Sequence, residues 1–482
     1  MDSIFQKNIV TLLSLENEHN INLVKQVFWI IVWFCSVCGM SAQEFQGITA
    51  DLSSGLYSMH INPASTAFYA YSYQVNISSG HFFGETNYAA VSNTSLLGLL
   101  NNYNDVDIAS NPNQINDGGN NSQLVFGENG GRRYGAVSAT YKWPSLLWTK
   151  DKITKMGIFG QTRLEGSFFR LPEALGYYEM AGVSFNPTTI GPFSAGFLSW
   201  SEVGFHLSKR IIEDNYQSSS FGFNGKFLLP HESGRFEMTD ELFFNREDNL
   251  YTGEMLRSSS QYTFFESGGF RPRITGMGLG FDLGYMSANE DQSYGFSILD
   301  LGFVRISGEA EAFDLISDTT IIYDNSGLLD PSDLNEVFND LDAQLDPQIS
   351  RLVDEKNAYF KGLPTALSFQ YHRKLNSSWG LSAIAVQRFP VFSNSVRRPN
   401  MVSVIPRFKK DLFHLAFPIS LFEYKAPSLG MSLNYWFFFV GTDNLLSHVP
   451  QNRFTGSDLY FGFQWFPFKE NRKDTKVRCF SF

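Results

Sequence analysis

The chain has 482 residues, of which 16% are aromatic and 18% are charged, and its formal net charge is −11. The negative charge argues against a nucleic-acid-binding protein, and the mean hydropathy of −0.16 argues against a bundle of membrane-spanning helices. Of the 3 cysteines, Cys35 and Cys38 lie in an N-terminal apolar segment, so a mature chain would hold no disulfide framework.

Residues 1–42 are predicted to be a secretory signal peptide. The basic residue Lys25 precedes an apolar run over residues 27–37, and the small residues Ser41 and Ala42 follow it. This order is typical of export signals, and the run is shorter than a membrane-spanning helix. Residues 1–22 would then be an over-long start. The alternative is that the segment remains as an uncleaved anchor.

From residue 45 onward, apolar and polar residues alternate in runs that predict two-faced β-strands. One face is rich in Phe, Tyr, Trp and Leu, and the other carries Gly, Ser, Asn and isolated charges. The clearest runs lie at 71–78, 203–208, 221–227, 277–285, 367–372, 413–421, 429–439 and 459–465.

These runs favour an all-β fold, a transmembrane antiparallel β-barrel of about 14 strands, within a range of about 12–16, formed by residues 43–482. The best apolar faces extend over about 9–11 residues, the length that a tilted strand needs to cross the hydrocarbon layer. A soluble β-sandwich is the alternative, because its strands alternate in the same way. In the run 429–439, Leu433 is expected to face lipid near the middle of the bilayer.

Side chains on the polar faces are expected to point into the barrel. The candidates for the lumen are Glu202, His206, Lys226, Asp282, His372 and Asn434. The glycines at 276, 278, 280 and 284 share one strand face and lack the spacing and the strand–helix context of a dinucleotide-binding loop. We interpret them as small inward-facing residues.

Two segments break the alternation. The first, 92–133, is rich in Asn, Asp, Gly and Ser and is predicted to be a long polar extracellular loop. A calcium site there is the less favoured alternative, because no spacing matches an EF-hand. The second, 330–356, has helical periodicity and an acidic outer face, and Asp330 and Pro331 suit its N-terminus. It is predicted to be a helical insertion, either packed on the barrel rim or acting as a partner-binding or plugging element.

Several short motifs resemble those of known barrels. Asn62, Pro63 and Ala64 resemble the element that opens barrels of the long-chain fatty-acid transporter (FadL) type and the type IX secretion-associated PorV and PorP/SprF barrels. Segments 278–285, 298–303, 363–371 and 441–446 resemble an uncharacterised outer-membrane barrel family related to these proteins, and the resemblance spans residues 45–468. In the transporters, the Asn-Pro-Ala region lies in an N-terminal plug. Because few residues separate the signal from the first strand in this chain, a large plug is not expected.

The export signal and the barrel together predict a non-enzymatic protein of the outer membrane of a Gram-negative cell. Its expected role is passage of a small solute, hydrophobic solutes included, or accessory work in type IX-like secretion and surface assembly. Outer-membrane lipids, the barrel-assembly machinery and secretion or surface proteins are the expected partners; no nucleic acid, cofactor or metal is expected. The alternatives are a lipid-hydrolysing barrel enzyme with His206 or His372 in a Ser–His site, and a soluble secreted β-protein.

Overall fold

The computed structural model describes most of the chain after the predicted signal peptide, and that signal lies outside the described residues. The described ranges are 45–50, 52–102, 107–108, 122–126, 133–171, 188–190, 192–213, 217–238, 242–247, 250–255, 273–315, 320–324, 351–410, 412–449 and 453–467. No helix within these ranges is both long enough and apolar enough to cross a membrane.

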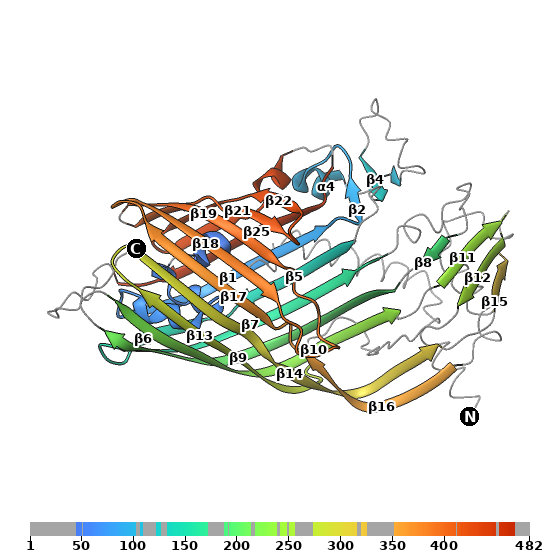
Figure 1. Ribbon diagram of the computed structural model, residues 1–482, viewed down its shortest axis with the longest axis horizontal. Helices are drawn as coiled ribbons and strands as arrows, with labels where there is room; N and C mark the ends of the chain where they lie inside the picture. The colour runs from blue at the N-terminus through green and yellow to red at the C-terminus, as the bar shows by residue number, and fades with distance from the viewer. Residues whose placement is uncertain are drawn as a thin grey trace.

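An antiparallel sheet closes on itself to form a barrel of 14 strands (Figure 1). The first strand, β1 (Tyr73–Thr86), pairs with the last, β25 (Gly456–Trp465), over the register Val75↔Trp465 to Glu85↔Gly456, which closes the barrel. Between them run β5 (Tyr134–Lys142), β6 (Ser145–Thr149), β7 (Thr154–Phe169), β9 (Phe193–Glu213), β10 (Ser218–Met238), β13 (Gly276–Ala288), β14 (Gln292–Leu315), β16 (Arg351–Gly362), β17 (Ala366–Lys374), β18 (Trp379–Arg388), β19 (Met401–Lys410), β20 (Phe413–Ala416), β21 (Ile419–Phe422), β22 (Ala426–Leu429), β23 (Met431–Tyr435) and β24 (Phe438–Thr442).

The barrel sheet contains 18 segments because four of its strands are each broken once. Pro144 separates β5 from β6, Pro364 separates β16 from β17, and Pro418 separates β20 from β21. Gly430 separates β22 from β23. Proline has no N–H to donate, so it interrupts a ladder of strand hydrogen bonds. Both halves of a broken strand pair with the same neighbouring strand; β16 and β17, for example, both pair with β14.

The two faces of each strand differ as the alternation predicts. On β9, the outward Val203 and Phe205 are 45% and 40% exposed, whereas the inward Glu202 and His206 are fully buried. The same contrast separates Leu283, 45% exposed, from its buried neighbour Asp282 on β13. An apolar outer surface over a polar interior is the arrangement of a barrel that meets lipid. The predicted all-β antiparallel barrel of about 14 strands is therefore confirmed.

The two ends of the barrel differ in the length of their connections. Short turns join β6 to β7 (150–153), β13 to β14 (289–291) and β17 to β18 (375–378) at one end. The connections at the opposite end include 87–133, 239–275 and 316–350. We call these the short-turn end and the long-loop end; in outer-membrane barrels they face the periplasm and the exterior, respectively.

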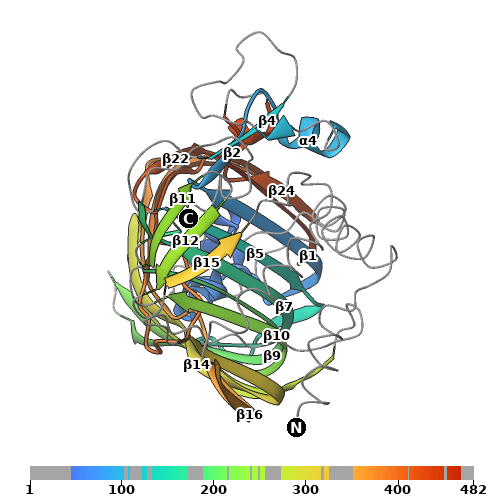
Figure 2. The same cartoon turned by 90° about the vertical axis from the view of Figure 1, so that its right-hand side faces the viewer.

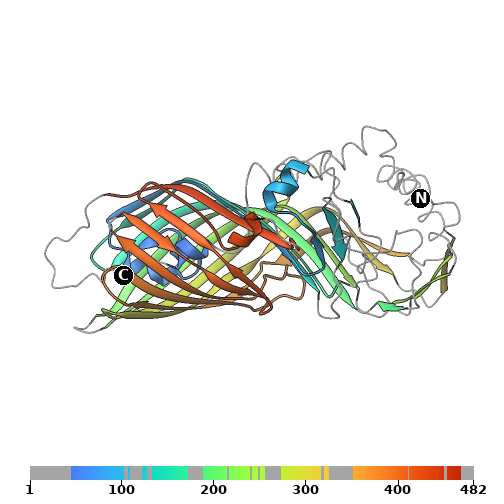
Figure 3. The same ribbon diagram turned by 90° about the horizontal axis from the view of Figure 1, so that it is seen from above.

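Small elements extend past the long-loop end (Figure 1, Figure 3). A four-stranded sheet has the order β15-β12-β11-β8, where β8 is Thr188–Ile190, β11 is Leu242–Glu247, β12 is Leu250–Met255 and β15 is Thr320–Asp324. A second group lies above the barrel rim in Figure 2. It consists of β2 (Ala89–Val91), β3 (Asp107–Ile108), β4 (Gln123–Phe126) and the helix α4 (Leu96–Asn102).

Three segment predictions need correction. Part of 92–133 is regular, because the apolar run Leu96–Asn102 forms α4 and β3 and β4 follow it; the rest lies largely outside the described residues. Residues 351–356 of the predicted helix begin β16, since β14 continues far enough to pair with them, and 330–350 lie outside the described residues. The run 429–439 is not one strand: Trp436 has a φ of 41°, and a tight turn reverses the chain between Tyr435 and Phe438.

Candidate functional site: the plugged lumen

The N-terminal segment lies inside the barrel (Figure 1, Figure 3). We call residues 45–70 the N-terminal plug. It contains α3 (Gln46–Thr49) and three short 3₁₀ helices, η1 (Leu52–Ser54), η2 (Ser58–His60) and η3 (Pro63–Phe68). Apolar plug residues such as Met59 and Ile61 are buried against the barrel wall. The plug is short, and consecutive tight turns pack it into a compact body inside the barrel.

The Asn-Pro-Ala element of the plug is closely fitted to the wall. Asn62 Oδ1 accepts a hydrogen bond from the Ala64 N–H at 2.9 Å and caps η3, in which Pro63 takes the first position. The Asn62 side chain also donates to Tyr285 O at 3.0 Å and to Gln370 Oε1 at 2.8 Å. Asn62 thus joins the plug to two separate strands of the barrel.

Two inward glycines of the wall make room for this element. A Cβ atom at Gly222 on β10 would lie 2.1 Å from the carbonyl carbon of Pro63, and one at Gly284 on β13 would lie 2.1 Å from Asn62 Oδ1. Both distances are far below van der Waals contact, so any larger residue at either position would displace the plug. The close approach of plug and wall explains why the inner faces of β10 and β13 carry glycine at these two positions.

A chain of hydrogen bonds connects η3 to the wall through His206. The His206 ring accepts at Nε2 from Thr66 Oγ1 at 2.7 Å and donates at Nδ1 to Asn224 Oδ1 at 2.6 Å. This tautomer follows from Asn224, whose amide nitrogen already donates to Met59 O and to Asp282. Thr66 Oγ1 also lies 2.6 Å from Ser208 Oγ. The plug is therefore held by directional bonds as well as by apolar packing.

Charged side chains gather in the lumen beyond the plug. We call this set the ionic cluster: Arg163, Glu165, Glu202, Lys226, Asp282, Asp300 and Arg398. Asp300 is its centre, with carboxylate oxygens 2.9 Å from Arg163, 2.7 Å from Lys226 and 3.0 Å from Arg398. Lys226 also contacts Asp282 at 2.8 Å. Each member is almost fully buried, so each charge depends on its partners for stabilisation.

A bulge in β14 places Asp300 in the lumen. The pairing register of β13 and β14 shifts between Phe281 and Leu283, and Asp300 has a φ of 51°. Leu299 and Asp300 are consequently both buried, although successive strand residues normally face opposite sides. Arg398 reaches the same point from 389–400, the connection between β18 and β19, so this long-loop-end segment folds back into the barrel.

The inward residues of β9 show the order of layers along the lumen. From the long-loop end, Ser194 and Gly196 line a pocket, and Leu198 and Trp200 belong to an apolar cluster. Glu202 then joins the ionic cluster, and His206 and Ser208 contact the plug. The apolar cluster, which we call the apolar layer, comprises Leu198, Trp200, Leu228, Val304, Ile306, Leu363 and Val396. The described lumen is thus closed by an inserted connection from one side and by the plug from the other.

A cavity lies between the plug and the ionic cluster. It encloses about 380 Å³, including space open to solvent, and its lining includes His60 and Phe45 from the plug and Lys142 and Arg163 from the wall. Burial lowers the pKa of His60 well below its usual 6.5, and the nearby Lys142, Lys226 and Arg163 lower it further, against the opposing effect of Asp300. His60 is therefore neutral at physiological pH, as a buried group beside cations must be.

The structure buries most of the residues expected in the lumen and gives them structural partners. Glu202 accepts from Gln161 at 2.6 Å and from Trp200 at 2.8 Å, and Asn434 accepts from Gln464 at 3.0 Å. His372 Nδ1 lies 2.9 Å from Ser382 Oγ, whose hydroxyl donates to Ala50 O of the plug. The His372 ring then donates to Ser382, which is the reverse of what a general base does.

The sequence did not reveal four members of the ionic cluster, Arg163, Glu165, Asp300 and Arg398. Arg163 falls in a weakly alternating run, the bulge shifts Asp300 out of the alternation, and Arg398 lies in a connection. Arg163 and Glu165 lie two residues apart on the same face of β7, and this pair of opposite charges is the signal that could have found them. Among the described residues, no group of three His, Cys, Asp or Glu side chains is arranged to hold a metal ion.

These features define the class of the protein: a closed β-barrel with an apolar outer surface and a plugged polar lumen. The chain belongs to the family of unknown function DUF5723, whose model matches residues 63–443. A comparison with curated protein sequences finds no match.

Solved barrels are similar over most of their length. The Pseudomonas putida toluene transporter TodX is 11% identical, with a TM-score of 0.38, over 86% of this chain and 94% of that one. A TodX deletion mutant described as a monoaromatic hydrocarbon channel is 9% identical, with a TM-score of 0.41, over 86% and 95%. A Pseudomonas aeruginosa FadL homologue is 11% identical, with a TM-score of 0.35, over 88% and 95%. Likenesses at this level do not identify a cargo for this chain.

Proposed function

We propose that the protein is an outer-membrane channel in which movement of the N-terminal plug opens a path for small solutes. One observation carries the proposal: a short segment, fitted to wall glycines and held by wall hydrogen bonds, fills the lumen of a closed barrel. The apolar outer surface supports a location in a lipid bilayer. The plug contacts His206 and Ser208, which lie toward the short-turn end of β9. Short turns face the periplasm in outer-membrane barrels, which supports a periplasmic position for this end.

The layers of the lumen favour a solute with an apolar part. The apolar layer lies nearer the long-loop end than the ionic cluster does, and Val396 of the inserted connection completes it. A solute that enters from outside would displace Val396 and take over its contacts with Leu198 and Trp200. The ionic cluster would then have to open, because a buried charge that loses its partner is costly. Hydrophobic solutes are accordingly the first class to assay.

A reversible lock on the plug tests the proposal. The hydroxyl oxygens of Thr66 and Ser208 lie 2.6 Å apart, so the Thr66→Cys and Ser208→Cys pair would bring two thiols together between plug and wall. The protein would be produced without residues 1–42, which hold Cys35 and Cys38, and Cys479 would be replaced by serine to leave no competing thiol. We expect solute uptake into liposomes to be absent under oxidising conditions and restored by reductant. The Thr66→Cys single variant is the control and should not respond to reductant.

Uptake of a hydrophobic dye and of a neutral sugar would be measured in parallel. Faster uptake of the dye supports the hydrophobic class, and equal uptake of both would replace it with a general pore. If the reduced pair and the wild-type protein transport neither solute, the channel proposal is wrong.

The accessory role in secretion or surface assembly is a second proposal. The sheet of β8, β11, β12 and β15 extends past the rim and gives the long-loop end a surface that a simple channel does not need. Cross-linking in intact cells tests it: a reproducible secretion or surface partner would support the role, and cross-links to lipid alone would oppose it. His206 is buried and bonded to the plug, and His372 is buried and bonded to Ser382, so neither residue favours the enzyme alternative.

A further inference from the structure

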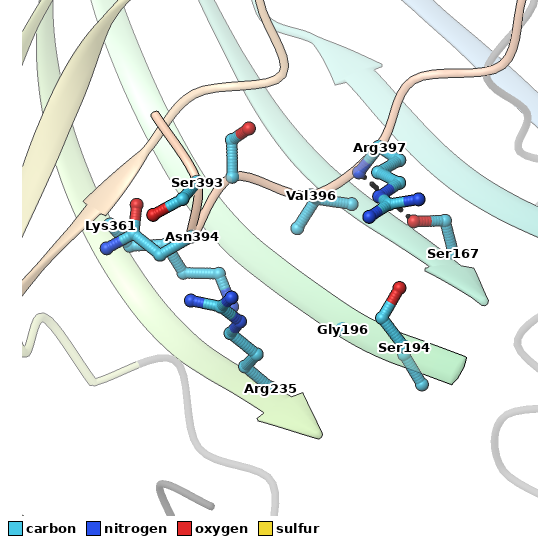
Figure 4. Close-up of a pocket in the computed structure, with 11 residues that line it drawn as sticks. Ser167, Ser194, Gly196, Arg235, Lys361, Ser393, Asn394, Val396 and Arg397 are labelled. Atoms are coloured by element: carbon cyan, nitrogen blue, oxygen red, sulfur yellow. Dashed lines mark hydrogen bonds between the residues drawn. The ribbon is translucent and has the colours of Figure 1, made fainter. Parts of the chain in front are cut away.

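A second pocket opens near the long-loop end of the lumen, between the barrel wall and the inserted connection (Figure 4). We call it the outer pocket; it encloses about 340 Å³, including space open to solvent. Its wall comes from the ends of β7, β9, β10 and β16, and its other side comes from residues 393–397. Its lining contains three cationic side chains, four serines and one asparagine, and no carboxylate.

We propose that the outer pocket binds a tetrahedral oxyanion, a phosphate or sulfate group. This goes beyond the channel proposal, because the site would bind its ligand whether or not the plug moves. The cations are Arg235, Lys361 and Arg397. Figure 4 shows Lys361 and Arg235 on one side of the pocket and Arg397 on the other.

Lys361 is the residue on which the site depends. It is 3% exposed, and its Nζ donates to Phe197 O at 2.9 Å and to Gly234 O at 2.7 Å. Both acceptors are neutral carbonyl groups, and no ion pair joins Lys361 to a carboxylate in the part of the chain that the structure describes. An ammonium group has a third donor, and when buried it either loses its proton or is stabilised by a compensating negative charge. A bound anion would supply that charge.

The two arginines come from opposite sides of the pocket. The Arg397 guanidinium lies 4.9 Å from the centre of the Phe169 ring, and the backbone N–H of Arg397 donates to Ser167 Oγ at 3.1 Å. Arg235 stands opposite Gly196 in the register of β9 and β10 and lines the pocket beside Lys361. Three cationic side chains around one polar space attract an anion into it.

The donor set suits a tetrahedral oxyanion better than a carboxylate. A carboxylate has two oxygens, whereas phosphate and sulfate present up to four that accept charged hydrogen bonds from several directions. Two guanidinium groups, one ammonium group and the Ser194 and Ser393 hydroxyls surround the space. The ligand could be the free ion or a phosphate group carried by a larger molecule, and the test separates these sources.

Calorimetry on the full-length barrel in neutral detergent, at low chloride, tests the proposal. Inorganic phosphate, sulfate, glycerol phosphate and acetate would be titrated into wild-type protein and the Lys361→Met and Arg235→Gln variants. Lys150→Met is the matched control, because Lys150 is exposed in the β6–β7 turn at the opposite end. Resistance of the folded barrel to detergent denaturation on gels would show that each variant has folded.

We expect phosphate or sulfate to bind wild-type and Lys150→Met equally, and at least 10-fold more weakly to Lys361→Met and Arg235→Gln. Binding of glycerol phosphate as well would identify a phosphate-bearing molecule as the source, and binding of the inorganic ions alone would identify the free ion. Equal or tighter binding of acetate, no binding to folded wild-type protein, or unchanged binding to Lys361→Met would overturn the proposal. Because the plug lock is not used, failure of the oxyanion to bind leaves the channel proposal untouched.

Discussion

Replacing Gly222 by alanine tests how closely the plug is fitted to the wall. The new Cβ would lie 2.1 Å from the Pro63 carbonyl carbon, and an ordinary contact needs about 3.4 Å, so the plug must move by about 1.3 Å, the difference between the two. The Ser220 Oγ to Ala64 O bond, now 3.0 Å, and the Asn62 to Tyr285 O bond, also 3.0 Å, would then exceed hydrogen-bonding distance.

Two lost hydrogen bonds weaken the docking of the plug by about 2 kcal/mol, which raises the population of displaced plug about 30-fold. A buried thiol would report this population. Ser65→Cys, in a chain whose Cys479 is replaced by serine, lies in the buried part of the plug and should react with a water-soluble maleimide only when the plug is displaced. The labelling rate of this variant, measured in nanodiscs, should rise about 30-fold on adding Gly222→Ala.

Gly225→Ala is the matched control on the same strand. A Cβ at Gly225 would meet only the Phe223 ring, at 3.1 Å, and would not approach the plug. Its labelling rate should therefore equal that of the parent. If the folded Gly222→Ala barrel is labelled no faster than the Gly225→Ala barrel, the plug is not closely fitted to the wall at Gly222.

Three further predictions follow from the site and the wall. Asp300→Asn leaves Arg163, Lys226 and Arg398 short of a counter-charge, so we expect the free energy of unfolding in urea to fall by about 3–5 kcal/mol; a loss below 1 kcal/mol would show that the cluster does not depend on Asp300. Leu283→Arg, midway along β13, should lower the free energy of unfolding by about 2–4 kcal/mol. Leu433→Arg, close to the turn after β23, should lower it by about 1 kcal/mol or less. Equal losses would contradict the position of the turn that ends β23. The pKa of His60 is lower in the docked plug than in a displaced one, so docking is fully stabilised above the usual pKa of 6.5 and weakens as the pH falls below it. Because the reactive thiolate form of any cysteine becomes scarcer as the pH falls, the labelling rate of the plug thiol would be divided by that of a free small-molecule thiol at the same pH. This ratio should rise between pH 7 and pH 5, and His60→Asn should remove the rise.

Alternation of apolar and polar residues predicted the fold because each barrel strand turns one face toward lipid and the other toward the lumen. Val203 and Phe205 could be assigned to the outer face, and Glu202 and His206 to the inner one, without any knowledge of their neighbours. The prediction failed where a local event overrides periodicity. The positive φ of Trp436 turns the chain inside an alternating run, and the bulge at Asp300 exchanges the two faces of β14.

The site was harder to predict than the fold because its residues meet only in three dimensions. Asn62 was identified from a motif, but its partners Tyr285 and Gln370 lie more than 200 residues away along the chain. Gly284 was predicted to be a small inward-facing residue, but nothing in the sequence indicates which segment uses the room that it and Gly222 leave. The acidic helical periodicity around residues 351–356 was misleading, because pairing with β14 decides the structure of that segment.

Conductance of single barrels carrying the Thr66→Cys and Ser208→Cys pair tests the central claim most directly. With the thiols oxidised, the plug is fixed to β9 and we expect a closed barrel with no openings. Adding reductant to the same bilayer should produce discrete openings in that same barrel, at the frequency of the wild-type protein. Openings of equal size and frequency before and after reduction would show that current passes without movement of the plug, and would contradict the proposal that the plug gates the channel.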